Sequence, residues 1–360
     1  MTLADDSAAA TVAFLAEAGA RQLGHRGGRS LLDHLLGTYI ILRRWDQPDW
    51  LCQAGLIHSV YSTDQYRQGL LSPSRRTEVA EVAGAQAERI AYLFCVTPRR
   101  PLFAGTHLWA RGLPSRAMAG AGDAAGGDPP TRDELDGLVL LHMANLAEQA
   151  HGADGRPGRW LLRVRDLAEY LIDSDTVTPP PFVAQLGAFS DADESLAHRA
   201  YVKAISDDGQ TRANGLALAA AACPVIPEPC VWLAHLARCR EEIATTRAWA
   251  TQARKRLLEL GTPWDRRLSF EEWLALIDAL EQSPGEHEPS EVKIVDPRAL
   301  LEASIGQAPA HRPPAPNTIA APDAAAGRKR FQRYVETLND GHGASSGAIY
   351  PDLPSRPWHD

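Results

Sequence analysis

The sequence lacks several features that would place it in a broad class of proteins. No uninterrupted apolar run reaches the roughly 18 residues that a membrane-spanning helix needs. The N-terminal stretch has neither the early positive charge nor the continuous apolar core of a signal peptide. No Lys/Arg-rich block of roughly 5–8 residues occurs, and the net charge is −8 with a pI near 5.9. We therefore expect a cytoplasmic protein with no membrane and no nucleic-acid partner.

Cysteine is scarce and follows no recognisable pattern. The five cysteines are odd in number and show no CxxC spacing. Cys52 and Cys95 fall in apolar helical contexts, which is typical of buried free thiols. The sequence therefore predicts free cysteines in a reducing compartment.

The chain is long enough for two or three domains, and helical periodicity dominates it. Its 360 residues include 44% hydrophobic and 23% charged residues, which is ordinary for a globular protein. The patterns predict an all-α fold. We expect a helical domain over residues 1–175, a second helical domain over residues 176–282, and a Pro/Ala-rich linker and tail over residues 283–360.

Two histidines stand out in residues 25–64. Ser30 is a suitable N-cap, and the leucines after it keep the period of an amphipathic helix with His34 inside the apolar stripe. A second helix is expected to start at Pro48 and to end near His58. Both histidines are thus predicted at buried faces of neighbouring helices, directed toward a common point.

The surroundings of the pair bear on its role. A lone histidine on an apolar face is more often a core residue whose hydrogen bonds are satisfied than a ligand of a metal. Here a polar, glycine-containing loop precedes the first helix and carries Arg26 and Arg29. Two guanidiniums beside two imidazoles are what an anionic or planar ligand requires.

This order of motifs resembles the HD-domain metal-dependent phosphohydrolases, most closely the (p)ppGpp-hydrolase branch, over residues 12–175. The resemblance implies that His34 is the first metal ligand and that His58 is the histidine of the His-Asp dipeptide. It also implies that Arg26 packs on a nucleotide base. The metal would be Mn²⁺, Fe²⁺ or Zn²⁺.

The acidic residues of that family are replaced. Ser59 stands where the dipeptide has Asp, and the acidic pair that follows falls on Ser62 and Thr63, so that Asp64 is the nearby carboxylate. The His-Ser version resembles a less characterised bacterial set that keeps it throughout.

A third helix is expected to complete the site. Thr131 and Glu134 have the spacing of a capping box before a strongly apolar helix. The family's last metal-binding Asp aligns with Leu141, unless the neighbouring His142 replaces it, and the family's Asn aligns with Asn145. We expect Asn145 to face the same centre as His34 and His58, because an amide buried without partners costs about 1–3 kcal/mol.

Tyr61 lies just after the second histidine. It either lines a ligand pocket or caps the core, and the same holds for Tyr66. The candidate ligand-binding residues are therefore Arg26, Arg29, Tyr61 and Asn145, and the candidate metal ligands are His34 and His58.

The second half of the chain has a different pattern. Three consecutive prolines within residues 176–181 mark a domain boundary. Short helices are predicted beyond it, in antiparallel pairs that resemble a degenerate tetratricopeptide-type repeat; an irregular helical bundle remains open. Their expected ranges are 192–205, 211–222, 228–240, 244–260 and 269–282.

The last residues, from Tyr350 onward, resemble the lead-in to aspartyl/asparaginyl β-hydroxylase-type domains, which are iron and 2-oxoglutarate oxygenases. The motifs of the hydroxylase itself are absent. This resemblance implies that the repeats recruit a protein partner, such as a 2-oxoglutarate oxygenase.

Two functions follow from these observations. The replaced carboxylates favour an HD-like module with a degenerate metal site that acts in small-ligand binding or as a scaffold. The retained histidines favour, as the alternative, a metal-dependent phosphohydrolase acting on a nucleotide or phosphoester.

Overall fold

The regular structure of this chain is helical. The computed structural model describes residues 3–25, 29–61, 69–97, 130–151, 155–171, 177–206 and 209–282. Within these ranges no strand is present, and only two isolated bridges occur, Gly24 with Ser30 and His151 with Pro157. The expected all-α class is confirmed.

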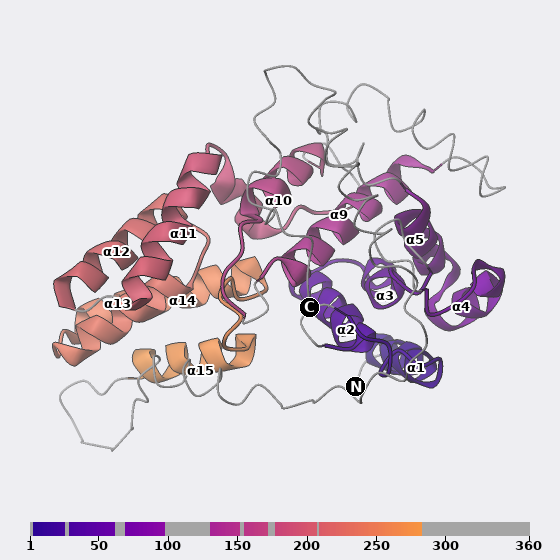
Figure 1. Cartoon of the computed structure of the whole chain (residues 1–360), viewed down its shortest axis with the longest axis horizontal. Coiled ribbons are helices and arrows are strands. Elements are labelled where there is room, and N and C mark those ends of the chain that lie inside the picture. Colours follow the sequence, from indigo (N-terminus) through magenta and orange to yellow (C-terminus); the bar gives the residue numbers. More distant parts are fainter. Residues whose placement is uncertain are drawn as a thin grey trace, which may run out of the picture. The chain divides into compact units, whose positions relative to one another are not determined.

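The described part of the first half is a set of helices. Their bounds are α1 (Leu3–Glu17), α2 (Leu31–Arg44), α3 (Asp49–Ile57), α4 (Arg76–Ala83), α5 (Ala85–Val96), α9 (Arg132–Gln149) and α10 (Leu161–Ala168). Of these, α2, α3 and α9 are those predicted to carry His34, His58 and Asn145. Helices α2, α3, α5 and α9 pack on one another (Figure 1). Gly55 permits the close approach of α3 to α2, because a Cβ at this position would lie 2.8 Å from Leu42 Cδ1.

Local sequence signals set most of the helix ends. Ser30 begins α2 with a capping box to Asp33, and Thr131 begins α9 in the same way with Glu134. The expected start of α3 was wrong by one residue. Pro48 has an extended backbone (ψ 150°) and is the N-cap residue just before the helix. A proline suits a helix start because it has no backbone N–H that would need a hydrogen-bond acceptor.

Two further helix ranges differ from the expectation. The first helix, expected over residues 8–23, ends at Glu17 because the chain turns at Gly19, whose φ of 99° only glycine adopts readily. The helix expected over residues 158–174 is α10, followed by the 3₁₀ turn Glu169–Leu171.

The second half forms further packed helices. They are α11 (Asp191–Ser206), α12 (Gly209–Ala222), α13 (Glu228–Cys239), α14 (Ile243–Leu260) and α15 (Phe270–Glu281), close to the expected ranges. Helix α11 packs on α12, and α13 packs on α14 (Figure 1). Trp232 and Trp273 are fully buried in this core. The tetratricopeptide-type subdivision stays a prediction.

The two halves are in contact across the expected boundary. The Trp45 indole N–H, at the end of α2, donates a 2.9 Å hydrogen bond to the carbonyl of Leu260, at the end of α14. The Gln47 amide donates to the carbonyl of Thr178. Residues Met1–Gly306 form one compact unit, and their division into two domains stays a prediction.

All five cysteines are free thiols, and four of them are buried. Burial raises the pKa of the Cys52 thiol to about 12, so this thiol stays protonated and unreactive at neutral pH. The expectation of buried free thiols thus fits Cys52 and Cys95, whereas Cys239 is exposed.

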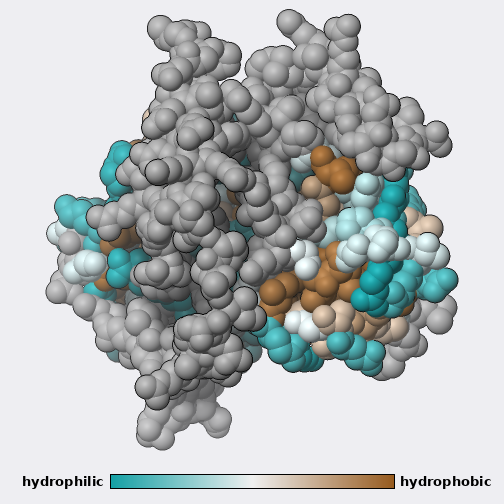
Figure 2. Space-filling view, turned by 45° about the vertical axis from the view of Figure 1, so that its right-hand side comes forward, coloured by the Kyte–Doolittle hydropathy of each residue, from teal (hydrophilic) through white to brown (hydrophobic). Residues whose placement is uncertain are grey.

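The surface of the described residues has few exposed large apolar side chains. These exposed side chains are Ile40, Leu218 and Leu258, and each lies on a different helix. Figure 2 shows apolar areas bordered by hydrophilic residues on the part of this face that is coloured. Among the helices described, none is long and apolar enough to span a membrane.

Several expectations lie outside the described residues. The residues rich in Pro, Gly, Ala and Arg over 98–130 predict a long loop, of which residues 98–129 are not described. Short helices are predicted at residues 297–304 and 325–339, and these lie outside the described residues together with the hydroxylase-like tail.

One buried carboxylate of the second half generates a prediction about pH. Glu228 is fully buried and accepts hydrogen bonds from the backbone amides of Trp264 and Asp265. Burial, together with the charge of Asp265, raises the pKa of the Glu228 carboxyl to about 8, against the lowering effect of these hydrogen bonds. The folded state therefore holds a proton on Glu228 between the ordinary glutamate pKa of 4.5 and about 8, and its stability falls as pH rises through this window.

We expect Glu228→Gln to remove this dependence, because a neutral amide does not ionise. The free energy of unfolding, measured with urea from pH 5 to pH 9, should fall with pH more steeply in the wild type than in the variant. Glu81→Gln, at an exposed position, is the control and should follow the wild type. Parallel curves for the wild type and Glu228→Gln would contradict the raised pKa.

Candidate functional site

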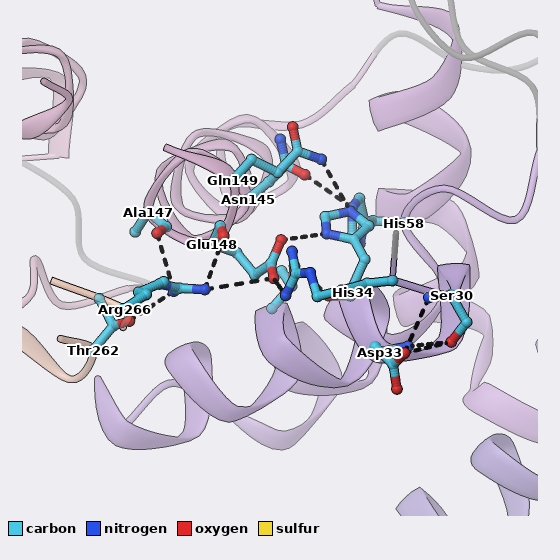
Figure 3. A network of polar contacts seen from close by, with 12 residues as sticks. Ser30, Asp33, His34, His58, Asn145, Ala147, Glu148, Gln149, Thr262 and Arg266 are labelled. Atoms are coloured by element: carbon cyan, nitrogen blue, oxygen red, sulfur yellow. Dashed lines mark hydrogen bonds and ion pairs between the residues drawn. The ribbon is translucent and has the colours of Figure 1, made fainter. Parts of the chain in front are cut away.

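Two histidine side chains meet in the core of the first half. His34 lies in the first turns of α2 and His58 ends α3, and both are completely buried. Their Nε2 atoms are 3.0 Å apart, and their rings meet edge to face (Figure 3). The structure thus brings together the two residues that the sequence directs toward a common point.

The other ring nitrogen of each histidine has an acceptor. His58 Nδ1 lies 2.8 Å from the carbonyl oxygen of Gly55, and His34 Nδ1 lies 2.5 Å from Glu148 Oε2. Since a carbonyl and an ionised carboxylate only accept, both Nδ1 atoms carry protons. The two Nε2 atoms would then face each other with lone pairs at 3.0 Å. Because lone pairs repel, a proton or another cation between them would turn this repulsion into attraction.

Helix α9 supplies two amides to the same centre. Asn145 Oδ1 lies 3.1 Å from His58 Nε2, and Gln149 Nε2 lies 3.3 Å from His34 Nε2 (Figure 3). A proton on His58 Nε2 would lie within hydrogen-bond distance of both Asn145 Oδ1 and His34 Nε2. Asn145 therefore lies at the centre that the sequence assigns to it, whereas Leu141, the position aligned with the missing carboxylate, is a buried apolar residue.

Glu148 is a completely buried carboxylate with three cationic neighbours. Besides His34, Arg29 lies 2.6 Å from Oε1 and Arg266 lies 3.6 Å from Oε1. Burial alone would raise the pKa of this carboxyl, but the hydrogen bond and charge of His34, with the charges of both arginines, lower the pKa to about 2. Glu148 thus stays ionised at neutral pH, and its contribution to stability is lost as pH falls from 4.5 toward 2.

A glycine on α2 makes room for this carboxylate. A Cβ at Gly37 would lie 2.9 Å from both Cγ and Oε1 of Glu148. Real Cβ contacts are almost never this short, so a larger residue at position 37 would displace the carboxylate. The absence of a side chain one turn after His34 is therefore part of the site.

Tyr61 does not join the histidine centre. Its hydroxyl donates a 3.0 Å hydrogen bond to Glu88, which also accepts two hydrogen bonds from Arg76. Burial and the charge of Glu88 raise the pKa of Tyr61. Of the two alternatives for this tyrosine, the contacts favour a core role. Tyr66 lies outside the described residues, as do Arg26 and Asp64.

His142 is buried and stacks on Phe94, with ring centroids 4.3 Å apart. Phe94 in turn meets the His58 ring edge to face at 4.8 Å. An aromatic ring thus contacts both imidazoles, and the replacement of the last metal ligand by His142 stays a prediction. Ser59, which takes the place of the dipeptide's Asp, is buried.

Sequence reasoning missed four residues of this site. Glu148 and Gln149 follow Asn145 by three and four residues on α9, and this helical spacing was a usable signal. His25 stacks on His34 with ring centroids 4.2 Å apart. Arg266 follows α14 and has no local signal that connects it with the histidines.

The donor set that the described residues provide at this centre suits some metals better than others. It contains two imidazole nitrogens and one amide oxygen, while Glu148 contacts the far side of His34. This set fits an ion that prefers imidazole, such as Zn²⁺, and does not fit Mg²⁺ or Mn²⁺, which prefer carboxylates. In the part of the chain that the structure describes, no three His, Cys, Asp or Glu side chains group as metal ligands.

Comparison with known proteins gives one match. Residues 14–99 match a domain of unknown function (DUF6817), which is less than half of the 360-residue chain. No curated protein and no solved structure matches. The matched segment contains both histidines, whereas Asn145, Glu148 and Arg266 lie beyond it.

The space that Gly37 leaves for Glu148 can be tested by a double-mutant cycle. Glycine to alanine inside a helix ordinarily stabilises by about 1 kcal/mol. Here we expect Gly37→Ala to destabilise, because its methyl group would meet the buried carboxylate. In the Glu148→Ala background the same substitution should regain its ordinary benefit.

The measurement is urea unfolding of the wild type, both single variants and the double variant. We expect a coupling of about 0.5–3 kcal/mol between the two positions, which is typical of residues in contact. Additive effects would contradict the position of the Glu148 side chain beside Gly37.

Proposed function

We propose that the first half of this protein is an HD-like helical module with a degenerate metal centre, which binds a small anionic ligand and does not hydrolyse phosphoesters. The observation that carries the proposal is the charge balance around His34 and Glu148. The HD-like architecture is proposed from the family resemblance. The change of function is proposed because the family's carboxylates are replaced in this sequence.

The charge count favours an anion. Among the described residues in contact with the pair, Glu148 provides one negative charge, and Arg29 and Arg266 provide two positive charges. A proton between the two Nε2 atoms, which lie 3.0 Å apart, would add a further positive charge. Because buried net charge is costly unless it is paired, this excess of positive charge is best matched by an anionic partner.

The same count disfavours hydrolysis. A metal-dependent hydrolase holds its ion with carboxylates and uses a further acid to assist water attack. Here Ser59 and Asn145 offer only hydroxyl and amide groups, and Glu148 is already bound by three cationic side chains. A divalent cation would also enter surroundings that are already positive.

Arg29 is the described residue best placed to meet a ligand from solvent. Its side chain is 31% exposed, while its guanidinium contacts the buried Glu148. It therefore connects the protein surface to the histidine centre. Arg26 of the same loop would serve the ligand as well, on the family resemblance.

The second half would act as a protein-binding scaffold. Its paired helices support a tetratricopeptide-like reading, and the hydroxylase-like tail makes a 2-oxoglutarate oxygenase the partner that we favour. The absence of a spanning helix among those described accords with a cytoplasmic location, which also belongs to this proposal.

A metal-dependent phosphohydrolase is the second candidate, favoured by the two facing Nε2 atoms. Imidazoles that bind a metal through Nε2 ordinarily donate Nδ1–H to a carboxylate or a carbonyl, as His34 and His58 do here. In that case His34, His58 and Asn145 would hold the ion. The ion would lower the pKa of a bound water and so supply a nucleophile.

Anion binding is tested by thermal unfolding with inorganic pyrophosphate at constant ionic strength. A ligand present at 100 times its Kd stabilises the folded state by about 2.7 kcal/mol, so we expect a higher melting temperature. Arg29→Gln should lose most of this shift, because the variant lacks the partly exposed positive charge beside Glu148.

Arg43→Gln is the matched control, because Arg43 lies on the same helix as His34 but pairs with Asp49 at the protein surface. Its pyrophosphate shift should equal that of the wild type. No shift in the wild type, or equal shifts in both variants, would refute the proposal.

Metal content separates the two candidates. For protein purified without a chelator or a histidine tag, our main proposal predicts far less than one transition-metal ion per chain. The hydrolase candidate predicts near-stoichiometric metal that is lost in His34→Ala and His58→Ala and retained in His235→Ala on α13. The latter result would decide in favour of the hydrolase.

A further inference from the structure

Arg266 reaches the histidine site from the second half of the chain. It lies in the loop of residues 261–268, between α14 and α15. Its guanidinium donates hydrogen bonds to the carbonyls of Ala147 (3.1 Å) and Glu148 (2.9 Å) at the end of α9, and to the hydroxyl of Thr262. Its Nη1 also lies 3.6 Å from Glu148 Oε1 (Figure 3).

This arrangement couples one side chain to both the backbone and the charge of Glu148. The end of a helix leaves carbonyls without intrahelical partners, and the planar fork of an arginine can bind two of them. Burial lowers the pKa of Arg266 to about 10, against the charge of Glu148, so the guanidinium stays positive at neutral pH. Arg266 thus binds the carbonyls at the end of α9 and at the same time attracts the Glu148 carboxylate.

The loop that carries Arg266 is fixed against the first half by close backbone contacts. The Arg266 amide donates to the carbonyl of Gly155, and a Cβ at Gly155 would lie 2.9 Å from the Arg266 backbone. The Trp264 indole donates to the carbonyl of Gly158. Such contacts permit little movement of the loop relative to the segment that follows α9.

The same loop is fixed from the other side by the second half. Asp265 accepts hydrogen bonds from the Tyr201 hydroxyl on α11 and from the Arg267 guanidinium. Its carbonyl accepts from the Trp273 indole on α15. Together with the amide contacts of Glu228 on α13, these bonds make the position of Arg266 depend on three helices of the second half.

We propose that Arg266 is a positioning residue of the histidine site, which acts through Glu148 on the orientation of His34. The second half is then an integral part of the site as well as a scaffold, and residues 14–99 alone do not build it. The effect on ligand affinity rests on the proposed anion-binding function, whereas the effect on His34 does not.

Two substitutions of Arg266 separate charge from structure. Arg266→Gln removes the charge, while Arg266→Lys keeps it and gives up the planar fork. Arg44→Gln is the matched control, because Arg44 donates to the carbonyl of Gly261 in the same loop and pairs with Glu271, but has no contact with Glu148. All variants are made in the full chain and compared well below their melting temperatures.

The first readout is the Kd for inorganic pyrophosphate from calorimetry. We expect Arg266→Gln to raise the Kd by about tenfold, which corresponds to one lost charge interaction in a buried site. Arg266→Lys should recover most of the affinity, and Arg44→Gln should bind as the wild type does. Equal affinities for Arg266→Gln and the wild type would show that Arg266 does not act on ligand binding.

The second readout needs no ligand. Hydrogen exchange of the peptides that cover α3 and the first two turns of α2, away from Arg44, reports how well the segments that carry His34 and His58 are held. We expect faster exchange there in Arg266→Gln than in Arg44→Gln. If the wild type does not bind pyrophosphate, the anion proposal fails, and this comparison still tests Arg266. Equal exchange in the two variants would overturn the positioning role.

Discussion

The contact between His34 Nδ1 and the Glu148 carboxylate is the interaction on which the rest of the site depends. A carboxylate taken completely out of water is very costly unless charged donors surround it. Glu148 obtains them from α2, from the loop before α2 and from the loop after α14. Each of these segments therefore has to be in place for the carboxylate to stay ionised.

The two halves of the chain shift the pKa of their buried carboxyl groups in opposite directions. Glu148 is surrounded by cations and has a pKa of about 2, whereas Glu228 faces backbone amides and a second carboxylate and has a pKa of about 8. The loop of residues 261–268 contacts both of them, through the Arg266 side chain and through the amides of Trp264 and Asp265. Acid neutralises Glu148 and so weakens its contact with Arg266, whereas alkali ionises Glu228, whose burial and repulsion from Asp265 then disfavour the folded state.

The chemistry of the centre follows from what surrounds the imidazoles. Hydrogen bonds fix a proton on both Nδ1 atoms, so both Nε2 atoms face the same point. Such a point attracts a proton or an imidazole-preferring metal. Ser59 and Leu141 stand where the family resemblance places acids, while Arg29 and Arg266 add positive charge, and for this reason we propose an anion as the complement to the whole site. The anion-binding proposal and the hydrolase hypothesis have only the position of the two histidines in common.

Local sequence signals predicted much of the fold. The N-cap at Ser30, the capping box at Thr131 and the period of the apolar residues placed α2 and α9, and with them His34 and Asn145, because these signals act within one or two helical turns. The same reasoning failed at the end of α1 and was one residue off at the start of α3. It also assigned Tyr61 no single role, since its partner Glu88 lies on another helix.

By itself, the sequence determined an all-helical chain, several of the helix ends and the burial of two histidines on neighbouring helices. Only the tertiary structure decided that Glu148 binds His34 across 114 residues and that Arg266 meets Glu148 across 118. Helical periodicity states which face of a helix is buried, but it carries no information about which distant side chain will meet that face. The charge of the site depends on such meetings, and hence on the packing of the whole chain.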